Sequence, residues 1–221
     1  MKQKLILVGL SLLFLTGCAT TTHTDTDNIE ELTVEAIAET TETIVSPALP
    51  EVITVKGEPV EIEKSQLLKP GDQLIGAPLI KPTTAFSTME KVDFSSFTGY
   101  KVIHIVPSLD TPVCSLQTRI LNSAASSFEN VTFMTVSQDL PFALSRFATT
   151  NNILTMNLLS DYQGNSFAIE NGLFMPAYQL NARALIITNP DNQVIYVEYV
   201  PEVTSEININ NAINFLRQNV K

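Results

Sequence analysis

The residues best suited to chemistry lie in the stretch Pro107-Ser-Leu-Asp-Thr-Pro-Val-Cys114. It follows an apolar segment, residues 100–106, that is predicted to form a strand, and it opens a pattern typical of a helix. Backbone N–H groups at a helix start are unpaired, and the helix dipole favours negative charge there. A thiol at that place loses its proton more readily, and the thiolate is the nucleophile. Because Thr111 can bring its hydroxyl beside the sulfur, Cys114 is a candidate nucleophile.

The other cysteine, Cys18, ends a segment typical of a secretory signal. Two lysines precede an apolar run over residues 5–15, which is too short to span a bilayer as a permanent helix. The ending Leu15-Thr16-Gly17-Cys18 resembles the lipobox of bacterial lipoproteins, in which the signal is cut before the cysteine and its sulfur carries diacylglycerol. The alternative is an ordinary cleaved signal with a chance cysteine. An acidic residue after the cysteine would resemble a signal for retention in the inner membrane, and this chain has Ala19 there. We therefore expect a location in the cell envelope, anchored through Cys18 in the outer membrane and facing the periplasm.

The remaining chain divides into two parts by composition. Residues 19–51 are rich in Thr, Glu, Ala and Pro with almost no aromatic residues, which predicts a disordered acidic tether. From Val52 onward the composition is globular, and the segment 52–221, of about 170 residues, fits a single domain. The net charge of −10 argues against nucleic-acid binding, which needs clustered Lys and Arg.

The hydrophobic pattern predicts alternating strands and helices in this domain. Alternation on both sides of a Lys-Gly-Glu turn predicts an N-terminal hairpin over residues 52–63. Strands are expected at 100–106, 131–136, 154–159, 183–188 and 194–200, and helices at 113–128, 141–149, 164–170 and 206–220. The first of these helices is expected to pack through Val113, Leu116, Ile120, Leu121, Ala124 and Phe128. This order favours an α/β layered domain with a central mixed sheet and helices on both faces.

The element order and the motif Pro107-x-x-x-Thr111-x-x-Cys114 resemble the peroxiredoxin superfamily, whose fold is thioredoxin-like. Three further stretches narrow the resemblance to the bacterial thiol peroxidases. They are Gly57-Glu-Pro-Val60 in the hairpin, Asp139-Leu-Pro-Phe-Ala-Leu-Ser-Arg-Phe147, and Ala182-Arg183-Ala184 at the start of a strand. The matches occur in the family's order and span nearly the whole domain.

The resemblance implies a thiol-dependent peroxidase. Cys114 matches the peroxidatic cysteine, which attacks the terminal peroxide oxygen, becomes a sulfenic acid and releases an alcohol or water. The family's active-site proline, threonine and arginine fall on Pro107, Thr111 and Arg183. Thr111 and backbone N–H groups would hydrogen-bond the peroxide, Arg183 would stabilise the thiolate and the developing charge, and Pro107 would shield the sulfur. The family also implies a homodimer that favours alkyl hydroperoxides. We expect alkyl or lipid hydroperoxides, and also hydrogen peroxide, as substrates.

The sequence departs from the family at one position. Thiol peroxidases usually carry a resolving cysteine directly after the Ser-Arg-Phe stretch, where this chain has Ala148. We therefore expect a one-cysteine mechanism, in which an external thiol reduces the sulfenic acid: a small thiol, a thioredoxin-like protein or a second Cys114. The alternative is a non-turnover redox sensor or binding lipoprotein that retains the fold.

Other polar and aromatic residues are expected to be structural. His104, inside an apolar strand, is expected in the core or on a dimer face, and Arg146 is expected to pair with Asp139 or to help orient the site. With two histidines in the whole chain we expect no metal site and no cofactor, and without Cys-x-x-Cys no disulfide reductase. The aromatic residues expected in the core, with the lining of a pocket for an alkyl tail as the alternative, are Phe86, Phe142, Phe147 and Phe174.

Overall fold

The structure is a computed structural model that describes residues 43–63 and 66–220. Cys18 and the predicted signal sequence lie outside these residues. Within the two described ranges, no helix combines the length and the apolar character that a membrane crossing requires.

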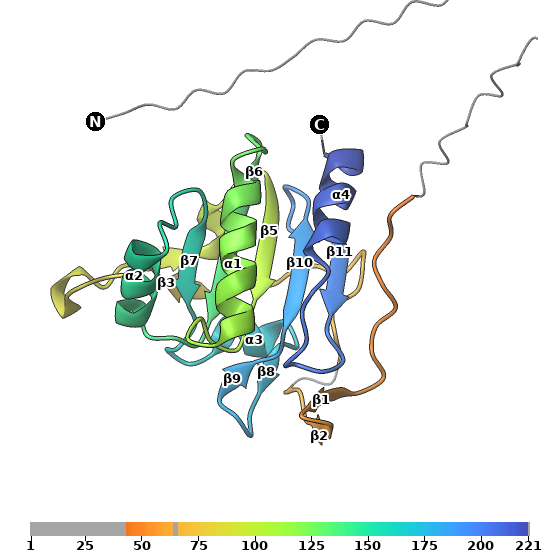
Figure 1. Cartoon of the computed structure of the whole chain (residues 1–221), viewed down its shortest axis with the longest axis horizontal. Helices are drawn as coiled ribbons and strands as arrows, with labels where there is room; N and C mark the ends of the chain where they lie inside the picture. Colours follow the sequence, from red (N-terminus) through yellow and green to blue (C-terminus); the bar gives the residue numbers. More distant parts are fainter. Residues whose placement is uncertain (1–42, 64–65, 221) are drawn as a thin grey trace, which may run out of the picture. The chain divides into compact units, whose positions relative to one another are not determined.

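A seven-stranded mixed sheet forms the centre of the domain (Figure 1). Its strand order is β11-β10-β5-β6-β7-β3-β4. The strands are β3 (Pro78–Ile80), β4 (Lys91–Asp93), β5 (Tyr100–Ile105), β6 (Val131–Ser137), β7 (Asn157–Ser160), β10 (Ala184–Thr188) and β11 (Val194–Tyr199). The strands β5, β6 and β7 pair in parallel, and the outer strands pair antiparallel. The prediction of a central mixed sheet is confirmed, whereas β3 and β4 were not predicted.

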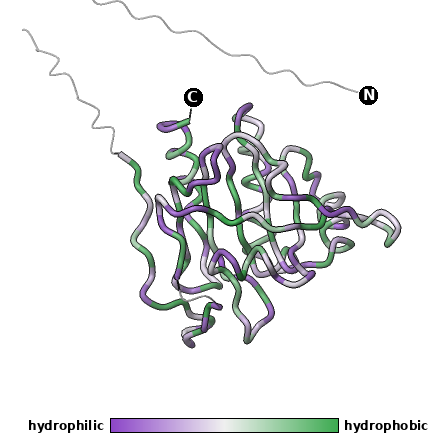
Figure 2. The backbone as a smooth tube through the Cα atoms, turned by 180° about the vertical axis from the view of Figure 1, so that it is seen from behind, coloured by the Kyte–Doolittle hydropathy of each residue, from purple (hydrophilic) through white to green (hydrophobic). Residues whose placement is uncertain are grey.

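In the described part of the chain, four α-helices cover the sheet: α1 (Pro112–Ala125), α2 (Pro141–Thr150), α3 (Ser166–Glu170) and α4 (Ile209–Asn219). Alternate residues of a strand face opposite sides of a sheet. Val102 of β5 packs in a cluster with α1 and α4, while its neighbour Ile103 packs in a second cluster with α3. The hydrophobic backbone segments accordingly run through the middle of the domain (Figure 2). Helices lie on both faces, as the α/β pattern predicts.

The predicted N-terminal hairpin is present as β1 (Ile53–Val55) and β2 (Glu58–Val60), with Ile53 opposite Val60. Its two turn residues, Lys56 and Gly57, have φ angles of 53° and 81°. A two-residue hairpin turn of this hand needs positive φ at both positions, and glycine adopts it without strain. A further short hairpin, β8 (Phe174–Met175) with β9 (Leu180–Asn181), was not predicted.

The folded part begins before Val52, where the sequence placed the domain boundary. The N–H of Ile44 donates to Oε1 of Gln218 at 3.2 Å, and Ser46 Oγ accepts from the N–H of Val197 at 2.9 Å. Residues 43–51 of the predicted tether therefore contact α4 and β11, which Figure 1 shows beside this orange segment. The rest of the predicted tether lies outside the described residues.

The buried face of α1 differs from the predicted one. Leu116 and Ile120 are 41% and 44% exposed, while Gln117 and Thr118 are buried. The polar pair is buried because it binds inward: Nε2 of Gln117 donates to the carbonyl of Ile207 at 2.8 Å, and Thr118 contacts other polar atoms of the core. The apolar pattern of this helix therefore does not identify the face that meets the sheet.

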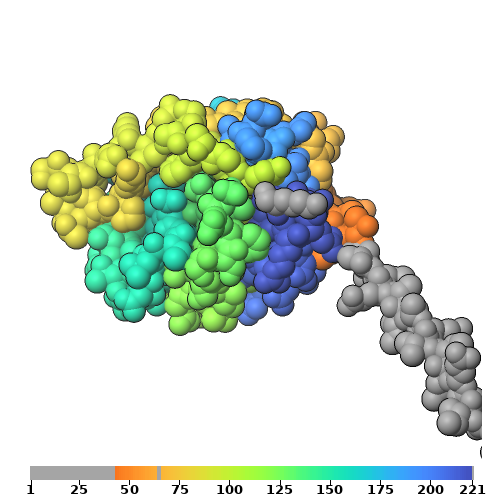
Figure 3. All heavy atoms as spheres, turned by 90° about the horizontal axis from the view of Figure 1, so that it is seen from above, coloured from red at the N-terminus to blue at the C-terminus, as the bar shows by residue number. Residues whose placement is uncertain are grey.

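Phe86 is not a core residue. It is 80% exposed in the arm between β3 and β4, and its ring contacts that of Phe142 with centroids 4.8 Å apart. Figure 3 shows this yellow arm standing out from the domain.

Candidate active site

The loop that carries the candidate nucleophile is held by Asp139, which follows β6. Its carboxylate accepts hydrogen bonds from Ser108 Oγ at 2.6 Å, the N–H of Leu109 at 2.7 Å and Ser137 Oγ at 2.8 Å. Buried or half-buried carboxylates with several donors fix the segments that supply those donors. The end of β6 thus fixes the Pro107–Thr111 loop that follows its neighbour β5.

Asp139 is a residue whose role the sequence analysis missed. The expected pair with Arg146 does not form, because the loop donors occupy the carboxylate. Arg146 instead donates from Nη1 to the carbonyl of Phe142 at 3.4 Å. The sequence did offer a signal for this role: Asp139 comes just after the segment that forms β6. Because β6 pairs in parallel with β5, the residues after these two strands lie at the same edge of the sheet.

Thr111 precedes the first turn of α1, yet its side chain makes no capping hydrogen bond. Its Oγ1 lies 2.8 Å from Cys114 Sγ and 2.9 Å from the carbonyl of Ser108. The hydroxyl has a single hydrogen, so it donates to one acceptor at a time. When the sulfur is a thiolate, this hydrogen can turn to it, and when the sulfur is a thiol, it can stay on Ser108. Thr111 can thus follow the ionisation of Cys114.

Cys114 itself is fully buried. It lies in the first turn of α1, where Pro112 supplies no N–H and the first intrahelical bond runs from Ser115 to Thr111. Its apolar neighbourhood consists of Val106, Leu109, Leu144, Ile153 and Leu158, with Ala148 of α2 packed against the same cluster. The sulfur therefore lies between α1, α2 and the sheet, and it reaches solvent only when this packing opens.

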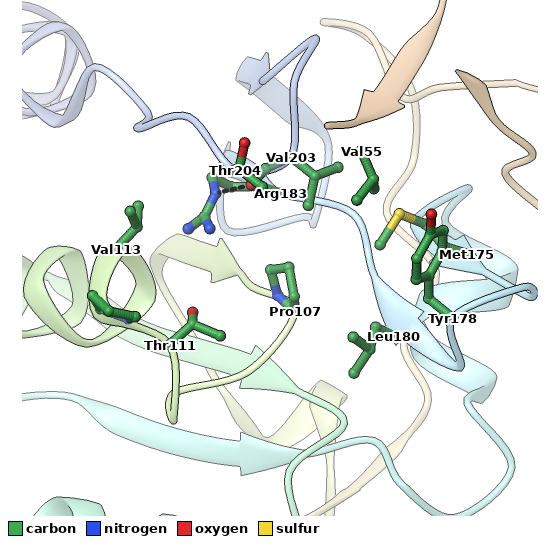
Figure 4. A pocket seen from close by; sticks show the side chains of 11 residues that line it. Val55, Pro107, Thr111, Val113, Met175, Tyr178, Leu180, Arg183, Val203 and Thr204 are labelled. Carbon is green, nitrogen blue, oxygen red and sulfur yellow. Dashed lines mark hydrogen bonds between the residues drawn. The ribbon is translucent and has the colours of Figure 1, made fainter. Parts of the chain in front are cut away.

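A cavity of about 270 Å³ adjoins the loop (Figure 4). Its lining residues are Val55, Pro107, Thr111, Pro112, Val113, Met175, Tyr178, Leu180, Arg183, Val203 and Thr204. Polar groups gather at one end, with Thr111 and Arg183 beside Pro107, and the far end is lined by apolar side chains such as Val55 and Leu180. Cys114 is not among the lining residues, so Thr111 is the side chain that touches both the sulfur and the cavity.

Arg183 places a buried cation in this cavity. The side chain is 3% exposed, and its Nε donates to the carbonyl of Val203 at 2.8 Å. Its Nη1 is buried and has no hydrogen-bond partner among the described residues. Figure 4 shows the guanidinium directed toward Pro107 and Thr111. Because an unpartnered buried donor is costly, an oxygen-rich ligand in the cavity would complete this arrangement. The three predicted residues Pro107, Thr111 and Arg183 meet here.

His104 lies beneath the site, on the side of β5 that faces α1. Its Nδ1 is 3.4 Å from the hydroxyls of both Thr118 and Thr135. Burial, and then the positive charge of Arg183, lower the pKa of His104 to about 3. His104 is therefore a neutral core residue. In the part of the chain that the structure covers, no three His, Cys, Asp or Glu side chains are grouped to hold a metal ion.

Comparison with known proteins agrees with this site. The Redoxin family profile matches residues 69–213. A thiol peroxidase of Streptococcus parasanguinis is 37% identical over 165 residues, which cover 74% of this chain and 97% of that protein. A thiol peroxidase of Leptospira interrogans is 36% identical over 167 residues, covering 73% and 94%.

A solved structure supports the same assignment. The peroxiredoxin-like protein from Aquifex aeolicus superposes with a TM-score of 0.69 at 30% identity, over 78% of this chain and 99% of that one. The fold is thioredoxin-like, as predicted, and the relatives are matched along nearly their whole length. The chain therefore belongs to the redoxin family, among its thiol peroxidases, and is a peroxiredoxin-type peroxidase.

Proposed function

We propose that this chain reduces organic hydroperoxides through Cys114, in a one-cysteine cycle that an external thiol completes. The observation that carries the proposal is the buried, unpartnered Nη1 of Arg183 in a cavity that also contains Thr111. A peroxide group supplies an oxygen acceptor for this Nη1, beside the Thr111 hydroxyl. The apolar far end of the same cavity suits an alkyl or lipid tail better than the water that would surround hydrogen peroxide.

In the first half of the cycle, the Cys114 thiolate attacks the terminal oxygen of the hydroperoxide. The S–O bond forms as the O–O bond breaks, and the departing alkoxide takes a proton to leave as an alcohol. Arg183 and the Thr111 hydroxyl lie on the cavity side, where they stabilise the charge that develops on the peroxide oxygens. The product on the enzyme is a sulfenic acid.

In the second half, one external thiol attacks the sulfenic acid and releases water, which leaves a mixed disulfide on Cys114. A second thiol then releases the Cys114 thiol and a disulfide of the reductant. Because the sulfur is fully buried, the first turn of α1 must open for the peroxide, and then for the first thiol, to reach it. The second thiol attacks the outer sulfur of the mixed disulfide, which belongs to the reductant. Without an internal partner the sulfenic acid persists, and it is open to further oxidation.

A turnover assay tests the proposal. The purified full-length chain is reduced, mixed with cumene hydroperoxide, and offered dithiothreitol, glutathione or a thioredoxin-like protein. We expect repeated turnover with at least one donor, a dimedone adduct at Cys114 when no donor is present, and no reaction in Cys114→Ser. If the reduced chain fails to consume one equivalent of peroxide, the proposal is wrong.

The one-cysteine step has a separate test in Ala148→Cys. Ala148 packs against the cluster that contains Cys114, so a cysteine there can capture the sulfenic acid. We expect Ala148→Cys to form an internal disulfide and to lose dimedone labelling after one equivalent of peroxide. Thr149→Cys, at the next and exposed position of α2, is the matched control and should keep the labelling. Equal labelling in all three proteins would contradict the predicted capture.

A redox sensor is the second candidate, and the complete burial of Cys114 favours it. A sensor would be oxidised once at Cys114 and would show no multiple turnovers with any donor. The same donor series therefore decides between the two functions.

We also propose that the chain is lipid-anchored through diacylglycerol on the sulfur of Cys18, and that it functions as a homodimer at the outer membrane. The lipobox-like sequence supports the anchor, and family membership supports the dimer. Incorporation of labelled palmitate that Cys18→Ala abolishes tests the first, and sedimentation of the reduced chain tests the second.

A further inference from the structure

Glu202, in the loop after β11, has a carboxylate crowded with donors. It accepts from the N–H groups of Lys56 at 3.0 Å and Gly57 at 2.9 Å, and from Thr54 Oγ1 at 2.9 Å. From its own loop it accepts the N–H of Thr204 at 3.1 Å and the hydroxyl of Thr204 at 2.6 Å. One carboxylate therefore joins the β1–β2 hairpin to a loop about 145 residues away in the sequence.

Backbone hydrogen bonds on either side of Glu202 complete the junction. The N–H of Thr54 donates to the carbonyl of Pro201 at 2.7 Å, and the N–H of Val203 donates to the carbonyl of Thr54 at 2.9 Å. The next residue of the hairpin, Val55, lines the cavity, as do Val203 and Thr204. The junction thus sets where two adjoining parts of the cavity wall lie.

An ionised carboxylate is the group this position needs. Hydrogen bonds from Thr204, and then from the N–H groups of Gly57 and Lys56, lower the pKa of Glu202 below its usual range. Both oxygens accept from the hairpin and neither has a hydrogen to offer. An amide of the same shape has an NH₂ group in place of one of these oxygens. The NH₂ group would lie opposite hydrogen-bond donors and could not accept from them.

We propose that Glu202 is a positioning residue that fixes the Val55 wall of the cavity and thereby sets the preference for hydroperoxides with large apolar tails. This inference rests on the proposed peroxidase function. The contacts of Thr111 and Arg183 with the O–O group are common to all peroxides. Only a tail reaches Val55, so a displaced hairpin penalises tailed substrates more than hydrogen peroxide.

The test compares second-order rate constants for oxidation of Cys114 by cumene hydroperoxide and by hydrogen peroxide. In Glu202→Gln, the ratio of the two constants should fall by about fivefold or more relative to the wild type. Val55→Ala, which leaves the carboxylate intact, should lower the same ratio. Because both changes act on the same wall of the cavity, the ratio in the double variant should fall no further than in the more affected single variant. An unchanged ratio in Glu202→Gln, or additive losses, would overturn the inference.

Glu198→Gln is the matched control, because Glu198 also accepts from a backbone N–H and a hydroxyl, those of Asn208 and Tyr196, away from the cavity. Its ratio should equal that of the wild type. Hydrogen exchange gives a readout independent of activity: the amides of Lys56 and Gly57 should exchange faster in Glu202→Gln and not in Glu198→Gln. An inert wild type would refute the proposed function, whereas an active wild type with unchanged variants would refute only the role of Glu202.

Discussion

The two ends of the cavity are built in different ways. The reacting end comes chiefly from one short stretch, Pro107–Cys114, which a single carboxylate, Asp139, holds against the neighbouring strand. The apolar end is assembled from the β1–β2 hairpin, the β8–β9 hairpin and the loop after β11, which lie far apart in the sequence.

This difference separates the chemistry from the choice of substrate. Geometry at the sulfur depends on the strand, loop and helix that contain it, so changes there should affect all peroxides alike. The tail contacts depend on long-range hydrogen bonds such as those of Glu202, so changes there should affect peroxides according to tail size. Arg183 belongs to both ends, because its free Nη1 lies in the cavity and its Nε is bound to Val203.

The largest effect is expected from Arg183→Met. Methionine keeps apolar bulk but removes the charge and the donors, and loss of one such electrostatic contact lowers rates by about 10²–10³-fold. We expect this loss for both cumene hydroperoxide and hydrogen peroxide in rapid-mixing experiments with the reduced chain. Arg217→Met, on α4 beside Asn214, is the control and should react at the wild-type rate. A loss confined to the bulky peroxide would assign Arg183 to the apolar end alone.

A smaller loss is expected from Asp139→Asn. The amide cannot accept all three hydrogen bonds, and one unsatisfied donor costs about 1–3 kcal/mol, so that a looser loop lowers the rate by about tenfold. The ratio between the two peroxides should stay at the wild-type value, which distinguishes this variant from Glu202→Gln.

The control for Asp139→Asn is Asp93→Asn. Asp93 ends the edge strand β4, and its carboxylate accepts a hydrogen bond from the N–H of Ser95. This variant should react as the wild type does. If Asp139→Asn changes the peroxide ratio, the two ends of the cavity are coupled through the loop, and the separation described above does not hold.

The sequence allowed the fold class and the reacting end to be predicted because their signals are local. Short apolar runs mark β5, β6, β10 and β11, helical spacing marks most helices, and the spacing of Pro107, Thr111 and Cys114 marks a turn before a helix. Arg183 was placed by family resemblance, and its burial against Val203 has no local signal.

The apolar end could not be predicted in the same way. The strands β8 and β9 have two residues each, too few for a pattern, and their pairing depends on tertiary contacts. On α1, Gln117 and Thr118 are buried because partners from other elements bind them, which composition does not reveal. The role of Glu202 has no signal in the sequence, since its donors in the hairpin lie about 145 residues earlier in the chain.

The smallest effect on catalysis is expected from His104→Gln, which should change acid stability. The pKa of His104 is lowered to about 3 by burial and by the charge of Arg183, whereas an unfolded histidine titrates near pH 6.5. Between these values the unfolded chain binds a proton that the folded chain does not. The free energy of unfolding therefore falls as the pH falls from about 6.5 toward 3, by up to about 1.4 kcal/mol per pH unit from this group.

Glutamine has no such titration and can still hydrogen-bond Thr118 or Thr135. In denaturant unfolding measured from pH 7 to pH 4, His104→Gln should show a shallower decline than the wild type, while differences at pH 8 report packing alone. Since His104 lies outside the cavity, the ratio of rates for the two peroxides should be the same in both proteins. Parallel stability curves would mean that His104 becomes protonated in the folded state near its usual pH, so that neither burial nor the charge of Arg183 lowers its pKa as expected.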